Sequence, residues 1–335
     1  MKKKTCFVTG ATGVVGPSLV WHLVEEGYQV RILIRPESDI RFLPDSVNSI
    51  IGDINDQEVV NRAVSGVDYV FHLAAKLHIN NPDPSLLIEY EQINVSGTKT
   101  IVDASAAANV QRLIFFSTIN VYGTSPGGEI LNENSPLNPE SFYAETKAKA
   151  EKIVLNAKRD IDGKPFGIVL RSAAVYGPQM KGNYTRVVRG LKQGWFYPIG
   201  RSLNRRTIVF DQDLVRAAVI AAKHPDSVSE IFNVTDGYIY TLKDIMDAIS
   251  MSLGKSPLRF HLPILPFRAA AYVLELLFRL FGKRSPVTRD TIDIMLEDRA
   301  VSGEKLQEEL GYEPNIDLKT GWSLAVKGIL KIDQA

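Results

Sequence analysis

A hydroxyl, a phenol and an ammonium group occur at a spacing that suits proton transfer. Tyr143 and Lys147 stand four residues apart in SFYAETKAKAE, a run of good helix formers, so both side chains should project from one face of a helix. Thr118 comes 25 residues earlier, directly after an apolar run. A neighbouring ammonium group favours the phenolate and lowers a tyrosine pKa from its usual ~10. We expect Tyr143 to exchange a proton with a substrate hydroxyl that Thr118 holds.

Taken alone, a tyrosine four residues before a lysine could equally be two polar residues on a solvated helix face. The run TGATGVVG near the N-terminus favours the catalytic interpretation, because it follows a short apolar segment and opens a helix-like one. Glycines at these points allow a tight turn, close approach of a pyrophosphate and contact between helix and strand. The helix N-terminus then offers free N–H groups to the phosphates. We therefore predict a dinucleotide site at Gly10, Thr12, Gly13, Val14, Val15 and Gly16.

Two residues after the glycine loop bear on the choice of cofactor. The next apolar run ends at Arg35, where an acidic residue would bind the ribose 2′-hydroxyl of NAD. An arginine suits a 2′-phosphate instead, because its planar fork binds phosphate oxygens. Asp53, in GDI, is placed to meet the adenine edge. The prediction is NADP(H), with NAD(H) as the alternative.

Strand-like and helix-like segments alternate through the first half and must position these groups. Buried strands are expected at residues 5–10, 29–35, 68–75, 111–117 and 165–172, and helices at 14–27, 85–108 and 141–160, with Asp56 capping a short helix. This alternation predicts an α/β fold, a doubly wound parallel sheet of the Rossmann type. We place the dinucleotide-binding domain at residues 1–178. A smaller, mostly helical substrate-binding region follows at 179–335, with short strands near 206–210 and 230–234, and some of its elements could return to the sheet.

The composition is that of an ordinary globular protein. The net charge of +1 excludes a strong field for nucleic acid, although a local basic cluster remains compatible with it. A single cysteine, Cys6, excludes a disulfide framework, and His72 and His78 lack the companions of a metal site, so no metal is predicted. The longest apolar stretch, residues 262–282, carries three charges, and we expect it to pack against its own domain rather than span or cover a membrane. A cytoplasmic protein is expected.

TGATGVVG, GDI, HLAA, NVSGT, STINVYG and YAETK occur in this order. In these motifs the chain resembles the extended short-chain dehydrogenases/reductases of the NAD-dependent epimerase/dehydratase family, over nearly its whole length. The resemblance implies a nucleotide-sugar substrate, a homodimer formed through helices near 90–108 and 143–158, and contact of Lys147 with the nicotinamide ribose. It also implies further cofactor contacts at Ile54, Leu73, Ala74, Ala75, Asn94, Ser117, Tyr143, Ala174 and Val175, and substrate contacts at Lys76, His78, Thr118, Asn120, Asn183 and Arg206.

Departures from the family pattern reduce the number of reactions that the resemblance implies. Dehydratases of the family resemble TDEVYG where this chain has Ile119 and Asn120, neither of which can serve as the acid and base of elimination. Arg206 matches an arginine that grips the nucleotide diphosphate, with Arg205 as a weaker candidate. Ala174, in LRSAA, replaces an asparagine common in sugar-nucleotide epimerases. A 4-epimerase or 4-ketoreductase is therefore predicted. The second half of the chain resembles bacterial enzymes of O-antigen and capsule synthesis that act on UDP-N-acetyl sugars, which implies the same class of substrate.

Two alternatives remain at this point. Relatives that act on hydroxysteroids share the motifs of the first half, although they usually lack the arginine-containing segment. Other proteins of this fold bind NADP as sensors without turnover, but those usually lose the tyrosine or the lysine, which this chain retains. Three neighbouring aromatic residues could stack on a uracil ring or form core or pocket wall: Trp195, Phe196 and Tyr197.

Overall fold

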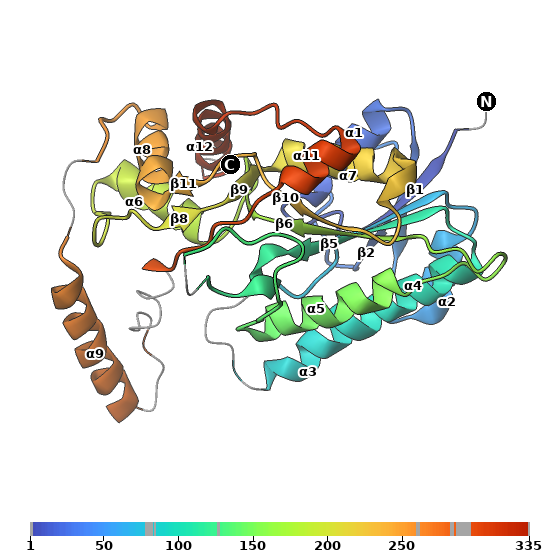
Figure 1. Cartoon of the computed structure of the whole chain (residues 1–335), viewed down its shortest axis with the longest axis horizontal. Helices are drawn as coiled ribbons and strands as arrows, with labels where there is room; N and C mark the ends of the chain where they lie inside the picture. Colours follow the sequence, from blue (N-terminus) through green and yellow to red (C-terminus); the bar gives the residue numbers. More distant parts are fainter. Residues whose placement is uncertain are drawn as a thin grey trace.

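A seven-stranded sheet forms the centre of the computed structural model, which describes residues 3–77, 83, 85–125, 128–258, 262–281, 285 and 296–333. The strand order is β10-β6-β5-β4-β1-β2-β3, and all neighbouring strands are parallel. This confirms the predicted Rossmann-type sheet (Figure 1). The strands are β1 (Thr5–Thr9), β2 (Gln29–Ile34), β3 (Asn48–Ile51), β4 (Tyr69–His72), β5 (Arg112–Thr118), β6 (Gly167–Ser172) and β10 (Ile231–Val234).

Helices cover both faces of the sheet because successive strand residues point to opposite sides. In β5, Leu113 and Phe115 join the core under α2 (Gln57–Val64), α4 (Gly97–Ala107) and α5 (Phe142–Leu155). Ile114 and Phe116 join the core under α1 (Gly16–Glu25), α7 (Asp211–Lys223) and α11 (Glu304–Leu310). Asp56 caps α2 as predicted, accepting bonds from the N–H groups of Glu58 and Val59.

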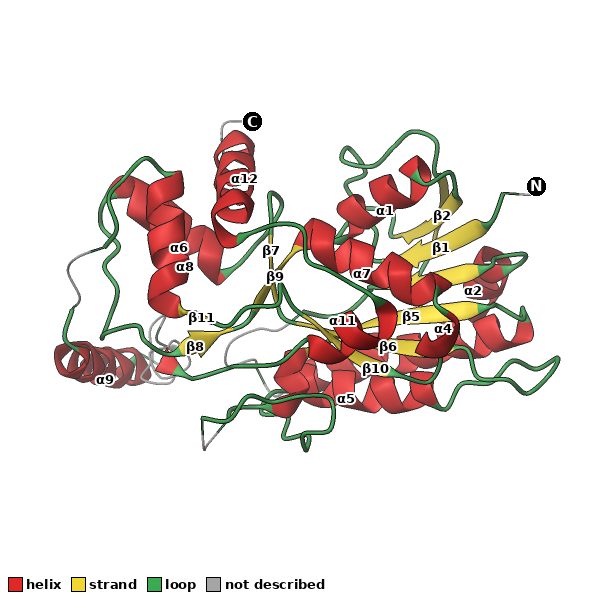
Figure 2. Cartoon of the chain, turned by 45° about the horizontal axis from the view of Figure 1, so that its top comes forward, coloured by secondary structure: helices red, strands yellow, loops and turns green. Residues whose placement is uncertain are grey.

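A third core holds the C-terminal region together. It lies between α6 (Asn183–Gln193), α8 (Leu242–Ser252) and α12 (Leu318–Ile332), beside the short pair β7 (Ala174–Tyr176) and β9 (Ile208–Phe210) (Figure 2). Trp322 stacks on Tyr176 with ring centroids 4.8 Å apart, and both side chains are fully buried. A second pair, β8 (Arg205–Arg206) and β11 (Tyr240–Thr241), is antiparallel.

The chain crosses between the two regions after residue 178. β10 pairs with β6 at the edge of the sheet, and α7 packs against α1, so a boundary in sequence is not a boundary in space. The helical segment expected at 85–108 is α3 (Leu86–Tyr90), a π-helix η1 (Glu91–Ser96) and α4 in succession. The helix expected to reach residue 160 ends at Leu155, since the chain turns back and Lys158 bridges Pro165. β3, an edge strand of four mostly exposed residues, was not predicted.

One helix departs from the expectation that it would pack against its own domain. In both views α9 (Ile264–Leu280) lies at the end of the molecule opposite the N-terminus (Figures 1 and 2). Ala271 is buried, but most of the large apolar residues of α9 are exposed. Among the helices that the structure describes, none is both long and apolar enough to cross a membrane.

Candidate active site

The glycine loop lies where the strand order reverses, between β1 and β4, which is where ligands bind in open α/β sheets. Gly10 has φ +74°, and a Cβ there would lie 2.7 Å from the Ala74 nitrogen. A Cβ at Gly16 would lie 2.3 Å from the Ala11 carbonyl oxygen. No side chain caps α1, so its first turn presents backbone N–H groups to a ligand. The loop therefore fits the pyrophosphate of a dinucleotide.

The other predicted cofactor residues of the first half line the same edge. Arg35 follows β2, is exposed, and lies 3.2 Å from a Glu37 carboxylate oxygen. Asp53 Oδ1 accepts a 2.8 Å bond from the Asn55 N–H and so stabilises its own turn. Ile54 packs against α4 at Gly97. Thr12 and Val15 are half-buried in the loop, and Val14 reaches the core of the C-terminal region.

His72 stands at the end of β4 in a directed chain of hydrogen bonds. Thr98 donates its only hydroxyl proton to the Asn94 carbonyl (2.7 Å), so it must accept from His72 Nε2 at 2.9 Å. His72 Nδ1 then accepts from the Thr9 hydroxyl at 2.7 Å, and Thr9 in turn accepts from the Ala74 N–H. Burial, with a contribution from the Lys147 ammonium, lowers the pKa of His72 to about 3. His72 is thus a neutral connector between the glycine-loop strand and α4.

Asn94 joins the loop that follows β4 to helix α5. Its Oδ1 accepts from the Lys76 N–H at 2.7 Å, and its Nδ2 donates to the Lys76 carbonyl and to the Thr146 hydroxyl. Thr146 shares its hydroxyl proton between the carbonyls of Phe142 (2.8 Å) and Tyr143 (3.0 Å) in the first turn of α5. The π-turn that carries Asn94 directs this side chain inward, as π-turns often do at functional sites. Its amide group is therefore used within the protein, which makes Asn94 a positioning residue in this structure.

Tyr143 and Lys147 lie on α5, which packs along β5 where that strand ends at Thr118. Lys147 is buried, with Nζ 3.8 Å from the centroid of the Phe115 ring. Burial lowers its pKa to about 7, against the opposing effect of Glu151. Burial raises the pKa of Tyr143 to about 12, and the neighbouring Tyr90 adds to the effect, which is opposite to the lowering expected from an ammonium neighbour. Tyr143 is therefore a phenol at neutral pH in this structure.

Beneath these residues lies a buried polar network that the sequence did not predict. Arg171 binds Glu151 through two nitrogens, with Nη2 2.7 Å from Oε2 and Nε 3.0 Å from Oε1. The Ser117 hydroxyl donates a hydrogen bond to Glu151 Oε1 at 2.5 Å. The side chain therefore points into this network rather than toward the glycine loop. Arg171 Nη1 also donates to the Tyr122 hydroxyl, which donates to Asn233. A glutamate four residues after Lys147 was the available signal.

The predicted diphosphate arginine, Arg206, lies among ion pairs of the C-terminal region, including Arg205–Asp298 and Arg299–Glu297. Burial lowers the pKa of Arg206, while the nearby Tyr184 raises it. Tyr184 is the second residue of α6 and follows Asn183, which is exposed at the N-terminus of that helix. Arg206 also forms a β-bridge with Arg299, an arginine that the sequence analysis missed. Arg299 Nη1 donates to Asn120 Oδ1 at 2.7 Å, two residues from Thr118, and so links the two regions.

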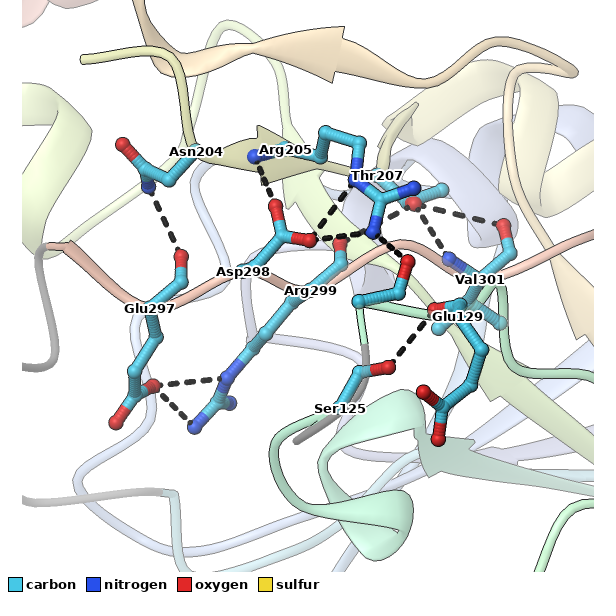
Figure 3. A network of polar contacts seen from close by, with 10 residues as sticks. Ser125, Glu129, Asn204, Arg205, Thr207, Glu297, Asp298, Arg299 and Val301 are labelled. Atoms are coloured by element: carbon cyan, nitrogen blue, oxygen red, sulfur yellow. Dashed lines mark hydrogen bonds and ion pairs between the residues drawn. The ribbon is translucent and has the colours of Figure 1, made fainter. Parts of the chain in front are cut away.

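Arg205, the weaker candidate, is used elsewhere. Its guanidinium binds the Asp298 carboxylate (2.5 Å), as Figure 3 shows, and it also donates to the Gly128 carbonyl. Thr207 on the same segment accepts from the Val301 N–H at 3.0 Å, and Asn204 donates to the Glu297 carbonyl at 2.9 Å. These bonds fasten residues 204–207 to residues 297–301. Arg205 is therefore a structural residue.

The remaining predicted residues take varied positions. The Lys76 ammonium lies 2.7 Å from a Glu89 carboxylate oxygen of α3. Ala174 is exposed and Val175 half-buried in β7, while Leu73 and Ala75 are half-buried after β4. His78 lies outside the described residues. Trp195 and Tyr197 are exposed, and Phe196 is half-buried against the C-terminal core. Within the described parts of the chain, no three His, Cys, Asp or Glu side chains gather as a metal site would require.

A family comparison agrees with this geometry. The pattern of the NAD dependent epimerase/dehydratase family matches residues 6–235, which run from β1 to just beyond β10. The chain belongs to this family. Its members' dependence on NAD is consistent with the glycine loop described above.

Individual relatives differ in their substrates. A UDP-glucose 4-epimerase of Vibrio cholerae is 27% identical over 98% of this chain and 96% of its own. An N-acetyl-alpha-D-glucosaminyl-diphospho-ditrans,octacis-undecaprenol 4-epimerase of Escherichia coli O157:H7 is 25% identical over 83% and 81%. A 3-beta-hydroxysteroid dehydrogenase of Mycolicibacterium neoaurum is 26% identical over 92% and 86%. The structure of MoeE5 in complex with UDP-glucuronic acid and NAD has a TM-score of 0.75 at 25% identity, covering 98% of this chain and 99% of that one.

Proposed function

We propose that the protein is a nicotinamide-dependent 4-epimerase or 4-ketoreductase of a nucleotide sugar, with UDP-N-acetyl sugars as the favoured class. The observation that carries the proposal is the link between two groups of residues. Helix α5, which carries Tyr143 and Lys147, packs along β5, which ends at Thr118, and Arg299 connects this end through Asn120 to the segment that carries Arg206. A sugar between these groups would place its ring by the phenol and its diphosphate by the guanidinium.

The proton transfer is assigned to Tyr143. A phenol with a pKa of about 12 donates a proton at neutral pH, the form needed when a C4 ketone is reduced to an alcohol. Thr118 would donate a hydrogen bond to the same oxygen, because its Oγ1 accepts from the Asn120 N–H and its own proton remains for a ligand. Lys147, which titrates near neutrality, would hold the nicotinamide ribose and favour the phenolate after transfer. The bound nicotinamide supplies reversible hydride transfer.

The local geometry also supports the exclusion of a dehydratase. Ile119 is buried, and Asn120 is bonded to Arg299. Neither side chain can transfer the proton that elimination requires. We further infer a preference for NADP(H) from Arg35, whose exposed guanidinium follows β2 at the predicted 2′-position and lies 3.2 Å from Glu37.

A second candidate is a dehydrogenase of hydroxysteroids or similar apolar alcohols. It is favoured by the similarity to the Mycolicibacterium neoaurum enzyme over nearly the whole chain and by the small Ala174. The same tyrosine and lysine would serve that reaction, but Arg206 would then have no diphosphate to bind.

The test begins with the purified protein, without added nucleotide. The protein is denatured, and any released dinucleotide is identified and counted. Near one NAD per chain would indicate an epimerase that returns the hydride to the same sugar. Little released dinucleotide and tighter binding of NADPH than NADH would indicate a reductase. UDP-N-acetylglucosamine, a 4-keto nucleotide sugar and a 3β-hydroxysteroid are then tested as substrates, and turnover of the steroid alone would contradict the proposal.

A further inference from the structure

The direction of the Thr118 hydroxyl depends on a residue two places further along the chain. Thr118 Oγ1 accepts a hydrogen bond from the Asn120 N–H at 3.2 Å, and so caps a short 3₁₀ helix, η2 (Ile119–Tyr122). Because this bond occupies the oxygen as an acceptor, the hydroxyl proton is directed at a ligand. Without it, the side chain could take other staggered positions about its first bond. The position of Asn120 therefore controls where the Thr118 hydroxyl points.

Arg299 holds Asn120 from the other region of the protein. Its Nη1 donates to Asn120 Oδ1 at 2.7 Å. On the opposite edge of the guanidinium, Nε and Nη2 lie 3.0 and 2.8 Å from Glu297 Oε2, as Figure 3 shows. An arginine can hold two partners on two edges because its planar fork of donors is rigid. The Arg299 side chain is 23% exposed, so water competes little for these bonds.

The backbone of Arg299 is itself fastened on two sides. The Arg299 N–H donates to the Arg205 carbonyl at 3.0 Å, on the segment that carries the predicted diphosphate arginine. On the other side, the Leu131 N–H donates to the Ala300 carbonyl at 2.9 Å, and the Ser302 N–H donates to the Leu131 carbonyl at 2.8 Å. Arg299 therefore holds Asn120 from a base that is fixed to both regions.

We propose that Arg299 is a positioning residue for the reaction, which directs the Thr118 hydroxyl at the reacting oxygen by holding Asn120. The inference rests on the proposed function of Thr118, but the alignment can be measured without a substrate. A displacement of about 1 Å in a group that orients the substrate can lower a rate about 10²-fold. Loss of Arg299 should therefore lower kcat more than it raises KM.

NMR of methyl-labelled threonine in the full-length protein tests this alignment. Three-bond couplings from Cγ2 to the backbone nitrogen and carbonyl carbon report the rotamer, and the Thr118 signal is assigned by its loss in Thr118→Val. The test variant is Arg299→Gln, which keeps a donor but loses the fork. The matched control is Arg205→Gln, because Arg205 is similarly exposed and binds Asp298 of the same segment. Both variants lose an ion pair of this segment, but Arg205→Gln leaves the bond to Asn120 in place.

We expect couplings of one Thr118 rotamer in the wild type and in Arg205→Gln, and averaged couplings in Arg299→Gln. In the reaction that the wild type catalyses, Arg299→Gln should lower kcat about 10- to 100-fold and change KM less than about threefold. Arg205→Gln should change kcat less than about twofold. In the Thr118→Val background, Arg299→Gln should cause no further loss, because the hydroxyl that it directs is absent.

Three results would overturn the proposal. An unchanged Thr118 rotamer in Arg299→Gln would show that Arg299 does not direct the hydroxyl. A full further loss of kcat in the Thr118→Val background would show that Arg299 acts elsewhere, and equal averaging in Arg205→Gln would show that the whole segment has loosened. The couplings need no substrate. A wild type that converts a steroid alone would therefore contradict the proposed function, while averaged couplings in Arg299→Gln would still support the role of Arg299.

Discussion

Glu151 and Arg171 form a buried ion pair directly beneath the residues proposed to act on substrate. Arg171 Nη2 lies 2.7 Å from Glu151 Oε2, and both side chains are almost completely shielded from water. Glu151 stands one helical turn after Lys147 and accepts the Ser117 hydroxyl next to Thr118. The pair therefore fixes α5 against β5 and β6, and its negative member supports the charge on Lys147.

Glu151→Gln should lower the free energy of unfolding and move the alkaline limit of activity to lower pH. Removing one charge leaves Arg171 buried without its counter-ion, so the free energy of unfolding should fall by about 3 kcal/mol in urea titrations. Loss of the carboxylate also lowers the Lys147 pKa further below about 7. The alkaline limb of kcat/KM, where the ammonium is lost, should move to lower pH.

Asp103→Asn is the matched control, since Asp103 pairs with Lys99 on the surface of α4. Exposed pairs of this kind contribute less than about 1 kcal/mol, and no change in the pH profile is expected. An unchanged alkaline limb in Glu151→Gln would show that the pair supports the fold alone.

His72 should be neutral and protonated on Nε2 across the physiological range. The Thr98 hydroxyl, which donates to Asn94, requires Nε2–H as the donor. Nitrogen-detected NMR of the imidazole reports this tautomer directly. Protonation on Nδ1, or titration of His72 near its ordinary pKa, would contradict the hydrogen-bond chain.

The same residue makes stability depend on pH in a defined window. The pKa of His72 is about 3 in the folded protein against 6.5 ordinarily, so between these values the unfolded chain binds a proton that the folded one does not. Stability should therefore fall as pH drops from 6.5 toward 3. His72→Gln, which keeps a donor and an acceptor without titrating, should show a shallower decline in urea midpoints over that window.

Arg206→Lys should weaken substrate binding more than the chemical step. A lysine keeps the charge but loses the planar fork, so KM for a UDP-sugar should rise about tenfold or more, with kcat much less changed. Arg189→Lys on the exposed face of α6, where the arginine pairs with Asp333, is the control and should leave both constants unaltered. Equal KM values in the two variants would show that Arg206 does not bind the substrate.

Arg35→Asp should reverse the cofactor preference. An aspartate repels a 2′-phosphate and accepts a bond from a 2′-hydroxyl, so the Kd for NADPH should rise about tenfold or more while that for NADH falls. Arg62→Asp, a charge reversal on exposed α2, should change neither. If the wild type already binds NADH more tightly, the inference from Arg35 is wrong.

Sequence patterns within short segments were enough to predict the sheet and the glycine loop. Gly10 and Gly16 are required by contacts within a strand–turn–helix unit, and the alternating apolar segments determine the parallel order. Residue spacing alone could not predict the contacts between segments that are far apart in the chain. Arg171, Arg299 and Asp298 gain their partners only when residues far apart in the chain meet, and burial reversed the expected direction of the Tyr143 pKa. Likewise, the apolar pattern of α9 predicted a packed helix, whereas its placement leaves that face in water.

The central claim is that Tyr143 transfers the proton at C4 of a nucleotide sugar. The most direct measurement compares wild type and Tyr143→Phe in converting UDP-N-acetylglucosamine to its C4 epimer, or a 4-keto nucleotide sugar to its alcohol, followed by proton NMR. The account predicts turnover by the wild type, a kcat about 10²–10⁴-fold lower in the variant, and an unchanged Kd for the dinucleotide. A variant that turns over at the wild-type rate would contradict it.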